Sequence, residues 1–240
     1  MYGRPKTIDS LGDKLVNKIK KGDNIPDINA AREKVEDGIG TRLIMDKIDE
    51  ESIQKITNKL CEEIKKYNIV LTEINNYRGE DLSPYFTDAQ IEQIRNTVLR
   101  AREEDTEHKF YPKGLKDFKT ITGTHEKAVK ASGYTAFQMN VIYKNGALGE
   151  IQIRGREMDQ LAEVEHIPYD TRQGKQLKPK YDSVVQKIKA LNDEAYKEYE
   201  NYWRKMYEYA VKKERGIPWP KPKLPEGIPK EISYEALQKI

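Results

Sequence analysis

Hydrophobic residues recur at helical spacing in two segments of the first half of the chain. Residues 51–68 carry one apolar stripe, made by Ile53, Ile56, Leu60 and Ile64. Residues 86–105 carry a second stripe, made by Ile91, Ile94 and Val98. Thr87 and Gln90 precede that stripe with the spacing of a capping box, which marks the start of a helix. The pattern therefore predicts two amphipathic helices, each with one buried face.

Four segments have the β-branched content or the alternating pattern of strands, namely residues 40–46, 68–77, 135–143 and 149–155. The last two are separated by KNGAL, in which Asn145 and Gly146 suit the left-handed positions of a tight turn, so they are predicted to form an antiparallel hairpin. Residues 105–132 are lysine-rich and polar, and are interpreted as one long loop of the kind that is usually functional or mobile. Strands and helices in this order predict an α/β or α+β layer architecture.

The C-terminal part of the chain is predicted to be helical and then extended. A helix over 156–166 brings Met158, Leu161, Ala162 and Glu165 close to one face. A longer helix is expected from about 180 to 214, and its aromatic stripe is typical of a packing face. That stripe consists of Tyr196, Tyr199, Trp203, Met206 and Ala210. Five prolines break the segment 216–240, which is interpreted as an arm outside the core, its first part extended or loose.

Composition adds few restrictions. The chain has 240 residues, enough to bury a sizeable core, and its net charge of +3 creates no global field for nucleic acid or a membrane. A single cysteine, Cys61, excludes an intrachain disulfide and a thiolate metal cluster. The polar start and the lack of a long apolar run predict a soluble, cytoplasmic protein without a membrane segment. A toxin module delivered to the cytoplasm of another cell has the same features.

The strand over 149–155 raises a question about chemistry. Its period of two places Ile151 and Ile153 on one face and Glu150, Gln152 and Arg154 on the other. An antiparallel strand with a solvated outer face explains this pattern, and so does a strand whose polar face meets a ligand. The strand alone leaves both interpretations open.

Two further clusters suit phosphate and metal chemistry. Residues 3–14 combine cations and hydroxyls at the start of a predicted helix, where the helix dipole and free amides favour phosphate. Asp37 precedes a predicted strand beside Gly38 and Gly40, an arrangement that suits a Mg²⁺ ligand as well as a solvated turn. Tyr134 follows Gly133, and its ring can either stack on a base or simply begin a strand.

Taken in order, these motifs resemble the synthetase domain of the RelA/SpoT family, the enzymes that make the alarmone (p)ppGpp. The resemblance is carried by GRPKTIDSLGDKL, DGIGTRLI, KDF, KASGYTAFQ, EIQIR and MDQLAEVEH, and spans roughly residues 3 to 170. It implies a nucleotidyltransferase-like mixed β-sheet flanked by helices in residues 1–175. Residues 176–215 would then be a C-terminal helix packed on that domain, and residues 216–240 a proline-rich arm.

The resemblance also implies a reaction and a set of site residues. The enzyme would be a GTP diphosphokinase-like pyrophosphokinase that transfers the β,γ-pyrophosphate of ATP, with Mg²⁺, to a ribose 3′-hydroxyl. Glu150 and Asp37 would be the catalytic and metal-binding acids. The residues implied for ATP are Arg4, Lys6, Ser10, Lys14, Arg42 and Arg154. Those implied for the acceptor nucleotide are Tyr134, Lys130, Lys116, Gln152 and Gln138.

The sequence departs from the family pattern in the acceptor strand, and this leaves the acceptor open. The family writes G-Y-x-S-x-H, whereas this chain has Gln138 at the histidine position, and the loop before Gly133 is longer than usual. A guanine nucleotide, GDP or GTP, is the first alternative. An adenine nucleotide or the 3′ end of tRNA is the second, as in a toxic relative, supported by the basic stretch 204–223. The third is an inactive nucleotide-binding or interaction module. A neutralising antitoxin and a second copy of the chain are the protein partners considered.

Overall fold

The computed structural model divides the chain into two compact units. It describes residues 2–5, 15–16, 19–20, 22–26, 39–46, 48–66, 69–76, 86–105, 119–121, 132–143 and 145–240. The first unit, called the sheet unit, consists of Met1–Ile44, Asp49–Ala128 and Ala136–Arg154. The second, called the helical unit, consists of Met45–Ile48, Val129–Thr135 and Gly155–Ile240.

The sheet unit is built on a six-stranded mixed sheet with the order β1-β2-β6-β5-β3-β4. Its strands are β1 (Tyr2–Pro5), β2 (Ile39–Met45), β3 (Ile69–Asn76), β4 (Lys119–Ile121), β5 (Phe137–Tyr143) and β6 (Leu148–Gly155). β4 pairs with β3 in parallel, whereas the pairs β1–β2, β3–β5 and β5–β6 are antiparallel. The mixed sheet and its flanking helices confirm the predicted α+β fold class.

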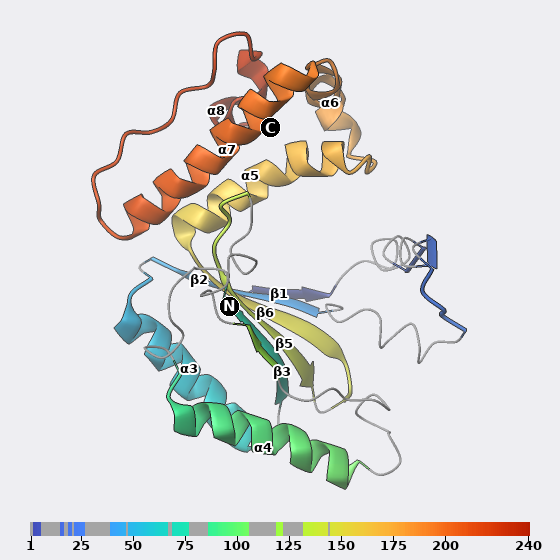
Figure 1. Ribbon diagram of the computed structural model, residues 1–240, viewed down its shortest axis with the longest axis vertical. Coiled ribbons are helices and arrows are strands. Elements are labelled where there is room, and N and C mark those ends of the chain that lie inside the picture. The colour runs from blue at the N-terminus through green and yellow to red at the C-terminus, as the bar shows by residue number, and fades with distance from the viewer. Residues whose placement is uncertain are drawn as a thin grey trace. The chain divides into compact units, whose positions relative to one another are not determined.

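Helices α3 (Glu50–Lys65) and α4 (Asp88–Glu104) lie along one side of this sheet (Figure 1). Both predicted apolar stripes are largely buried. Ile53 and Ile64 of α3 and Ile94 of α4 are at most 1% exposed, whereas Ile56 and Ile91 are half-buried. The capping box is confirmed at the start of α4, where the Gln90 backbone N–H donates to the Thr87 hydroxyl and the Thr87 backbone N–H donates to the Gln90 side chain. Local sequence signals therefore suffice for these two elements.

The predicted hairpin of β5 and β6 is also confirmed. Gly146 has φ = 77°, a left-handed conformation in which glycine has no steric penalty. The turn is closed by a hydrogen bond from the Tyr143 backbone N–H to the Ala147 carbonyl at 2.9 Å. The interpretation of residues 105–132 as one unbroken loop is wrong for Lys119–Ile121, which form β4. β4 pairs with β3, which is distant in the sequence, and no local pattern predicts such a contact.

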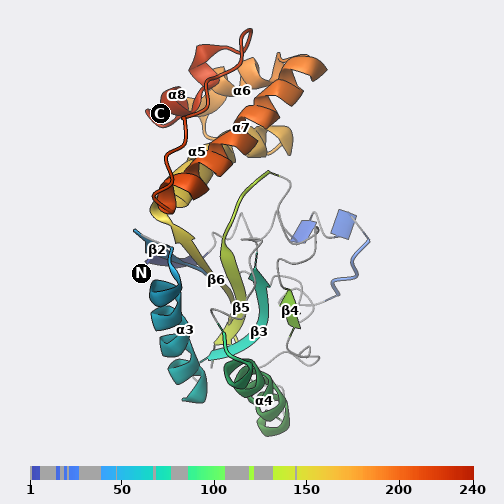
Figure 2. The same ribbon diagram turned by 60° about the vertical axis from the view of Figure 1, so that its left-hand side comes forward.

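The helical unit contains α5 (Arg156–Arg172), η1 (Pro179–Tyr181), α6 (Asp182–Lys189), α7 (Asp193–Glu214), η2 (Lys230–Ile232) and α8 (Tyr234–Leu237). Figure 2 shows α6, α7 and α8 gathered with α5 into one helical group. Their core is rich in aromatic side chains, and Tyr199, Trp203, Met206 and Ala210 of α7 are all buried in it. The aromatic stripe is therefore a packing face, as predicted.

Two predictions for the C-terminal region are corrected. The single helix expected over 180–214 is interrupted between α6 and α7, because Asn192 caps α7 by accepting a hydrogen bond from the Ala195 backbone N–H. The segment 216–240 is not entirely an arm outside the core. Its first part, Ile217–Pro225, has no helix or strand, but Ile228, Ile232 and Leu237 are buried among the helices. None of the described helices is long and apolar enough to cross a membrane.

The N-terminus of α5 is capped by a residue from another helix, which gives a test of the packing. Gly155, the N-cap residue, has no side chain, and Glu214 of α7 instead accepts a 2.8 Å hydrogen bond from the Met158 backbone N–H. A Cβ atom at Gly155 would lie 2.0 Å from Glu214 Oε1. We expect Gly155→Ala to displace this carboxylate and to lower the free energy of unfolding by about 1 kcal/mol, measured by urea denaturation.

A double-mutant cycle controls for effects of the added methyl group alone. In a Glu214→Ala background the same Gly155→Ala change should cost much less stability, because the displaced carboxylate is already gone. An equal loss in both backgrounds would contradict the capping role of Glu214.

Candidate active site

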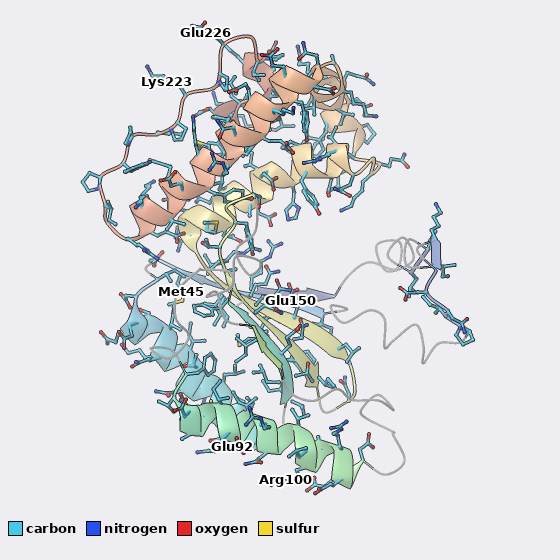
Figure 3. The ribbon with its side chains drawn as sticks, viewed as in Figure 1. Met45, Glu92, Arg100, Glu150, Lys223 and Glu226 are labelled. Atoms are coloured by element: carbon cyan, nitrogen blue, oxygen red, sulfur yellow. The ribbon has the colours of Figure 1, made fainter. Side chains whose placement is uncertain are left out.

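Polar side chains from two neighbouring strands meet on one face of the sheet. Gln138 of β5 lies directly opposite Gln152 of β6, and Asn140 lies opposite Glu150. Directly opposed residues of an antiparallel pair project to the same face, and so do residues two apart on one strand. Figure 3 labels Glu150 on this sheet. The structure therefore brings together Glu150, Gln152 and Gln138, which the sequence assigned to one site.

These side chains form a continuous hydrogen-bonded chain. The amide groups of Gln138 and Gln152 both donate to the carboxylate of Glu150, each to a different oxygen. Arg154 Nη2 donates in turn to Gln152 Oε1 at 2.8 Å. Donation by Arg154 fixes which end of the Gln152 amide is the oxygen, so the amide nitrogen must face Glu150. The network holds the Glu150 carboxylate in one orientation.

Burial decides between the two interpretations of the strand. Arg154 is 2% exposed, and Glu150 and Gln152 are half-buried. A buried guanidinium is costly unless it is hydrogen-bonded, so a solvated outer face does not describe this strand. The polar face of β6 is instead an organised, partly enclosed set of charged and amide groups, which is typical of a binding site.

The third strand of this face adds residues that the sequence analysis missed. Glu73 of β3 lies opposite Asn140, and Asn75 lies opposite Gln138. Asn140 Nδ2 donates a 2.6 Å hydrogen bond to Glu73 Oε2, and Asn75 is 5% exposed. Glu73 and Asn75 of β3 are separated by one apolar residue, as are Gln138 and Asn140 of β5, so part of the signal was present in the sequence. Only the pairing of β3 with β5 shows that they share a face with Glu150.

Two of the predicted ATP-binding cations lie on the paired strands β1 and β2. Arg4 of β1 is opposite Gly40, and Arg42 of β2, which is half-buried, is opposite Tyr2. Because Gly40 and Arg42 are two residues apart on β2, Arg4 and Arg42 are two register positions apart on the paired strands.

Several predicted site residues fall outside the described residues, namely Lys6, Ser10, Lys14, Asp37, Lys116 and Lys130. Within the described ranges, no group of three or more His, Cys, Asp or Glu side chains is placed to hold a metal ion. The carboxylate of Glu150 does fit the predicted Mg²⁺, because its oxygens are hard donors. Each of these oxygens accepts one amide hydrogen bond.

Tyr134, the predicted base-stacking residue, belongs to the helical unit. Gly133 has φ = 85°, as expected for a glycine that frees the backbone at this point. The Tyr134 ring is partly buried and packs edge-on against Tyr207, with the ring centroids 6.1 Å apart. The ring is thus held in place by α7 while part of its surface stays accessible.

Comparisons with known proteins give a family match and distant structural likenesses. Residues 3–174 match the family model described as a region found in RelA / SpoT proteins. The solved structure of small alarmone synthetase 1 from Bacillus subtilis is 15% identical, with 90% of this chain and 74% of that chain covered and a TM-score of 0.49. A GTP pyrophosphokinase family protein from Streptococcus pneumoniae is 16% identical, with 100% and 78% covered and a TM-score of 0.46. No curated protein matches this chain.

Proposed function

The chain belongs to the RelA/SpoT family, and from this premise we propose that it is an ATP-dependent pyrophosphokinase that makes (p)ppGpp. It would transfer the β,γ-pyrophosphate of ATP to the ribose 3′-hydroxyl of GDP or GTP. The observation that carries the proposal is the oriented Glu150 carboxylate on the half-buried polar face of β6. A general base must be held in place within reach of the proton that it removes, and the amides of Gln138 and Gln152 meet the first of these requirements.

The proposed step is an in-line displacement at phosphorus. The acceptor 3′-oxygen bonds to the β-phosphorus of ATP, the bond from that phosphorus to the bridging α,β-oxygen breaks, and AMP leaves. Glu150 accepts the proton of the 3′-hydroxyl. Mg²⁺ held by Asp37 and Glu150 would supply neutralisation of the phosphate charge.

The remaining proposed roles concern binding. Arg4, Lys6, Ser10, Lys14, Arg42 and Arg154 would bind ATP, whereas Tyr134, Lys116, Lys130, Gln138 and Gln152 would bind the acceptor. The buried Arg154 also has a positioning role, because its hydrogen bond to Gln152 fixes the amide beside Glu150. Positioning and charge neutralisation account for most of the catalysis in phosphoryl transfer, so rigid polar networks of this kind are what the reaction requires.

A second candidate acceptor is an adenine nucleotide or the 3′ end of tRNA. Gln138, which stands where the family has histidine, is engaged with Glu150 through its amide, so the acceptor strand is chemically altered next to the proposed base. Arg204 and Lys205 of α7 are exposed cations within the basic stretch 204–223 and suit a phosphate backbone. The third candidate, an inactive binding module, predicts no transfer at all.

One experiment separates the three candidates. The purified protein is incubated with Mg²⁺ and ATP labelled on the γ-phosphate, with GDP, GTP, adenine nucleotides and bulk tRNA in separate reactions. We expect label on GDP or GTP, resolved by thin-layer chromatography. Label on tRNA or an adenine nucleotide, with guanine nucleotides unlabelled, would replace the first candidate by the second. The absence of label from every acceptor would favour the inactive module.

A further inference from the structure

The backbone segment that carries Tyr134, the predicted base-stacking residue, lies directly against α7. A Cβ atom added at Gly133 would lie 3.1 Å from Tyr207 Cβ and 3.4 Å from the Arg204 carbonyl oxygen. The first distance is tighter than ordinary van der Waals contact, so a glycine lets the segment approach the helix this closely. The segment and α7 both belong to the helical unit. Contact with α7 therefore fixes the backbone on which the Tyr134 ring is mounted.

The ring of Tyr134 is oriented by a second contact with the same helix residue. It meets the Tyr207 ring at an interplanar angle of 88°, with the centroids 6.1 Å apart. This edge-to-face arrangement is one that aromatic pairs favour, and in it one ring covers at most one face of the other. The Tyr134 side chain is only partly buried. Tyr207 can thus hold the ring and leave a face that stacks on a nucleobase.

Tyr207 is itself fixed within the core of the helical unit. It is 1% exposed, and its hydroxyl donates a 3.2 Å hydrogen bond to Glu165 Oε2 of α5. Helices α5 and α7 pack against each other (Figure 1). A close-packed side chain that is held at its Cα by one helix and at its hydroxyl by another has little freedom to change rotamer. Tyr207 therefore presents an almost invariant surface to Tyr134.

We propose that Tyr207 is a positioning residue for the acceptor nucleotide, because it holds the Tyr134 ring in the orientation that stacks on the acceptor base. The assignment of Tyr134 as the stacking residue rests on the proposed function. Tyr207 touches no substrate and acts through Tyr134. A side chain that must be ordered when a ligand binds lowers the affinity, whereas one that is already fixed does not. Loss of the Tyr207 ring should therefore weaken acceptor binding and leave ATP binding unchanged.

Two substitutions separate the role of the ring from that of the hydroxyl. Tyr207→Leu removes the ring, whereas Tyr207→Phe keeps the ring and loses the hydrogen bond to Glu165. Both should lower the free energy of unfolding in urea. In steady-state kinetics with labelled ATP we expect Tyr207→Leu to raise the KM for the acceptor about fivefold or more, with the KM for ATP unchanged. Tyr207→Phe should keep both KM values close to those of the parent.

The matched control is Tyr199→Leu, the same chemical change in the same helix. Tyr199 is also 1% exposed, and its ring packs against Tyr202 and Trp203. This variant should lose stability without a change in either KM. A rise in the acceptor KM equal to that of Tyr207→Leu would show that damage to the core is responsible, and would overturn the proposal.

A double-mutant cycle tests whether Tyr207 acts through Tyr134. In a Tyr134→Leu background, Tyr207→Leu should cause no further rise in the acceptor KM, because the stacking ring is already absent. A further rise of the size seen in the parent background would contradict the positioning role.

Equilibrium dialysis with labelled GDP and with labelled ATP measures binding without turnover, and so separates this proposal from the proposed function. If the parent transfers no label but Tyr207→Leu weakens GDP binding and not ATP binding, the proposed function fails and the positioning role stands. If the parent transfers label and Tyr207→Leu leaves the acceptor KM unchanged, the positioning role fails and the proposed function stands. An inactive parent that does not bind GDP, or whose GDP binding Tyr207→Leu leaves unchanged, would overturn both.

Discussion

The Glu150→Gln variant should fold normally and lose pyrophosphate transfer by about 10³-fold or more in kcat. Glutamine is nearly isosteric with glutamate. In the parent protein Gln138 and Gln152 donate to the Glu150 carboxylate, and the amide of the variant can still form hydrogen bonds with both side chains. It cannot accept the 3′-hydroxyl proton, and it is a poor Mg²⁺ ligand. The assay is the labelled-ATP reaction with the acceptor that the unmodified protein uses, and urea denaturation checks the fold.

The control is the same chemical change at Glu92, an exposed residue of α4 labelled in Figure 3. Glu92 pairs with Arg95 on the surface of the sheet unit, a contact of small energetic value. Glu92→Gln should therefore keep full activity. If Glu150→Gln retained more than about a tenth of the parent rate, Glu150 would not be the general base, since such bases contribute about 10² to 10⁴-fold.

The elements that could be predicted from the sequence are those whose signals are local. The capping box of Thr87 and Gln90 involves residues three apart, and the turn at Gly146 requires a conformation that glycine adopts readily. The break between α6 and α7 also had a local signal, because Asn192 is followed by Asp193 and Glu194, the composition of a helix start. The aromatic periodicity across this point concealed it.

The features that the sequence did not reveal depend on contacts distant in the chain. β4 exists through its parallel pairing with β3, and Ile232 is buried because the chain returns to the helices after a proline-rich segment. A pattern of prolines predicts extended backbone, but it does not say what the following residues pack against. The tail is thus part of the core at its end despite its composition.

The candidate site divides in the same way. The alternation along β6 was sufficient to place Glu150, Gln152 and Arg154 on one face, and the structure adds that Arg154 is buried there. That Glu73 lies on the same face could be recognised only from the register between β3 and β5. This register shifts between Leu71 and Glu73. Glu165 was recognised only as a residue near the apolar face of its helix. Its hydrogen-bond partner, Tyr207, lies on α7, 42 residues further along the chain, and no helical periodicity within α5 indicates such a partner.

The stability of the protein should depend on pH through Glu165. In the folded chain the pKa of this carboxyl is raised to about 7 from an ordinary value of 4.5, mainly by burial. Between these two values the unfolded chain has released the proton and the folded chain retains it. Stability contributed by this group is therefore present at low pH and is lost as the pH rises from about 4.5 to about 7, by on the order of 3 kcal/mol.

The Glu165→Gln variant should lack this loss, because an amide does not titrate. The side chains around Glu165 that can also titrate are Asp170 on α5 and Tyr196, Tyr199 and Tyr207 on α7. They are retained in the variant, as is the acceptor for the Tyr207 hydroxyl. Urea unfolding at several values between about pH 5 and about pH 8 should give a parent that becomes less stable than the variant as the pH rises. Parallel pH profiles for the two proteins would show that Glu165 titrates normally.

Glu165 lowers stability near neutral pH, so its presence is not explained by a contribution to folding. Glutamine at this position would keep the Tyr207 contact without the cost of a buried charge, and the packing of α5 against α7 would gain from the exchange. Sites that bind ligands commonly sacrifice stability in this way.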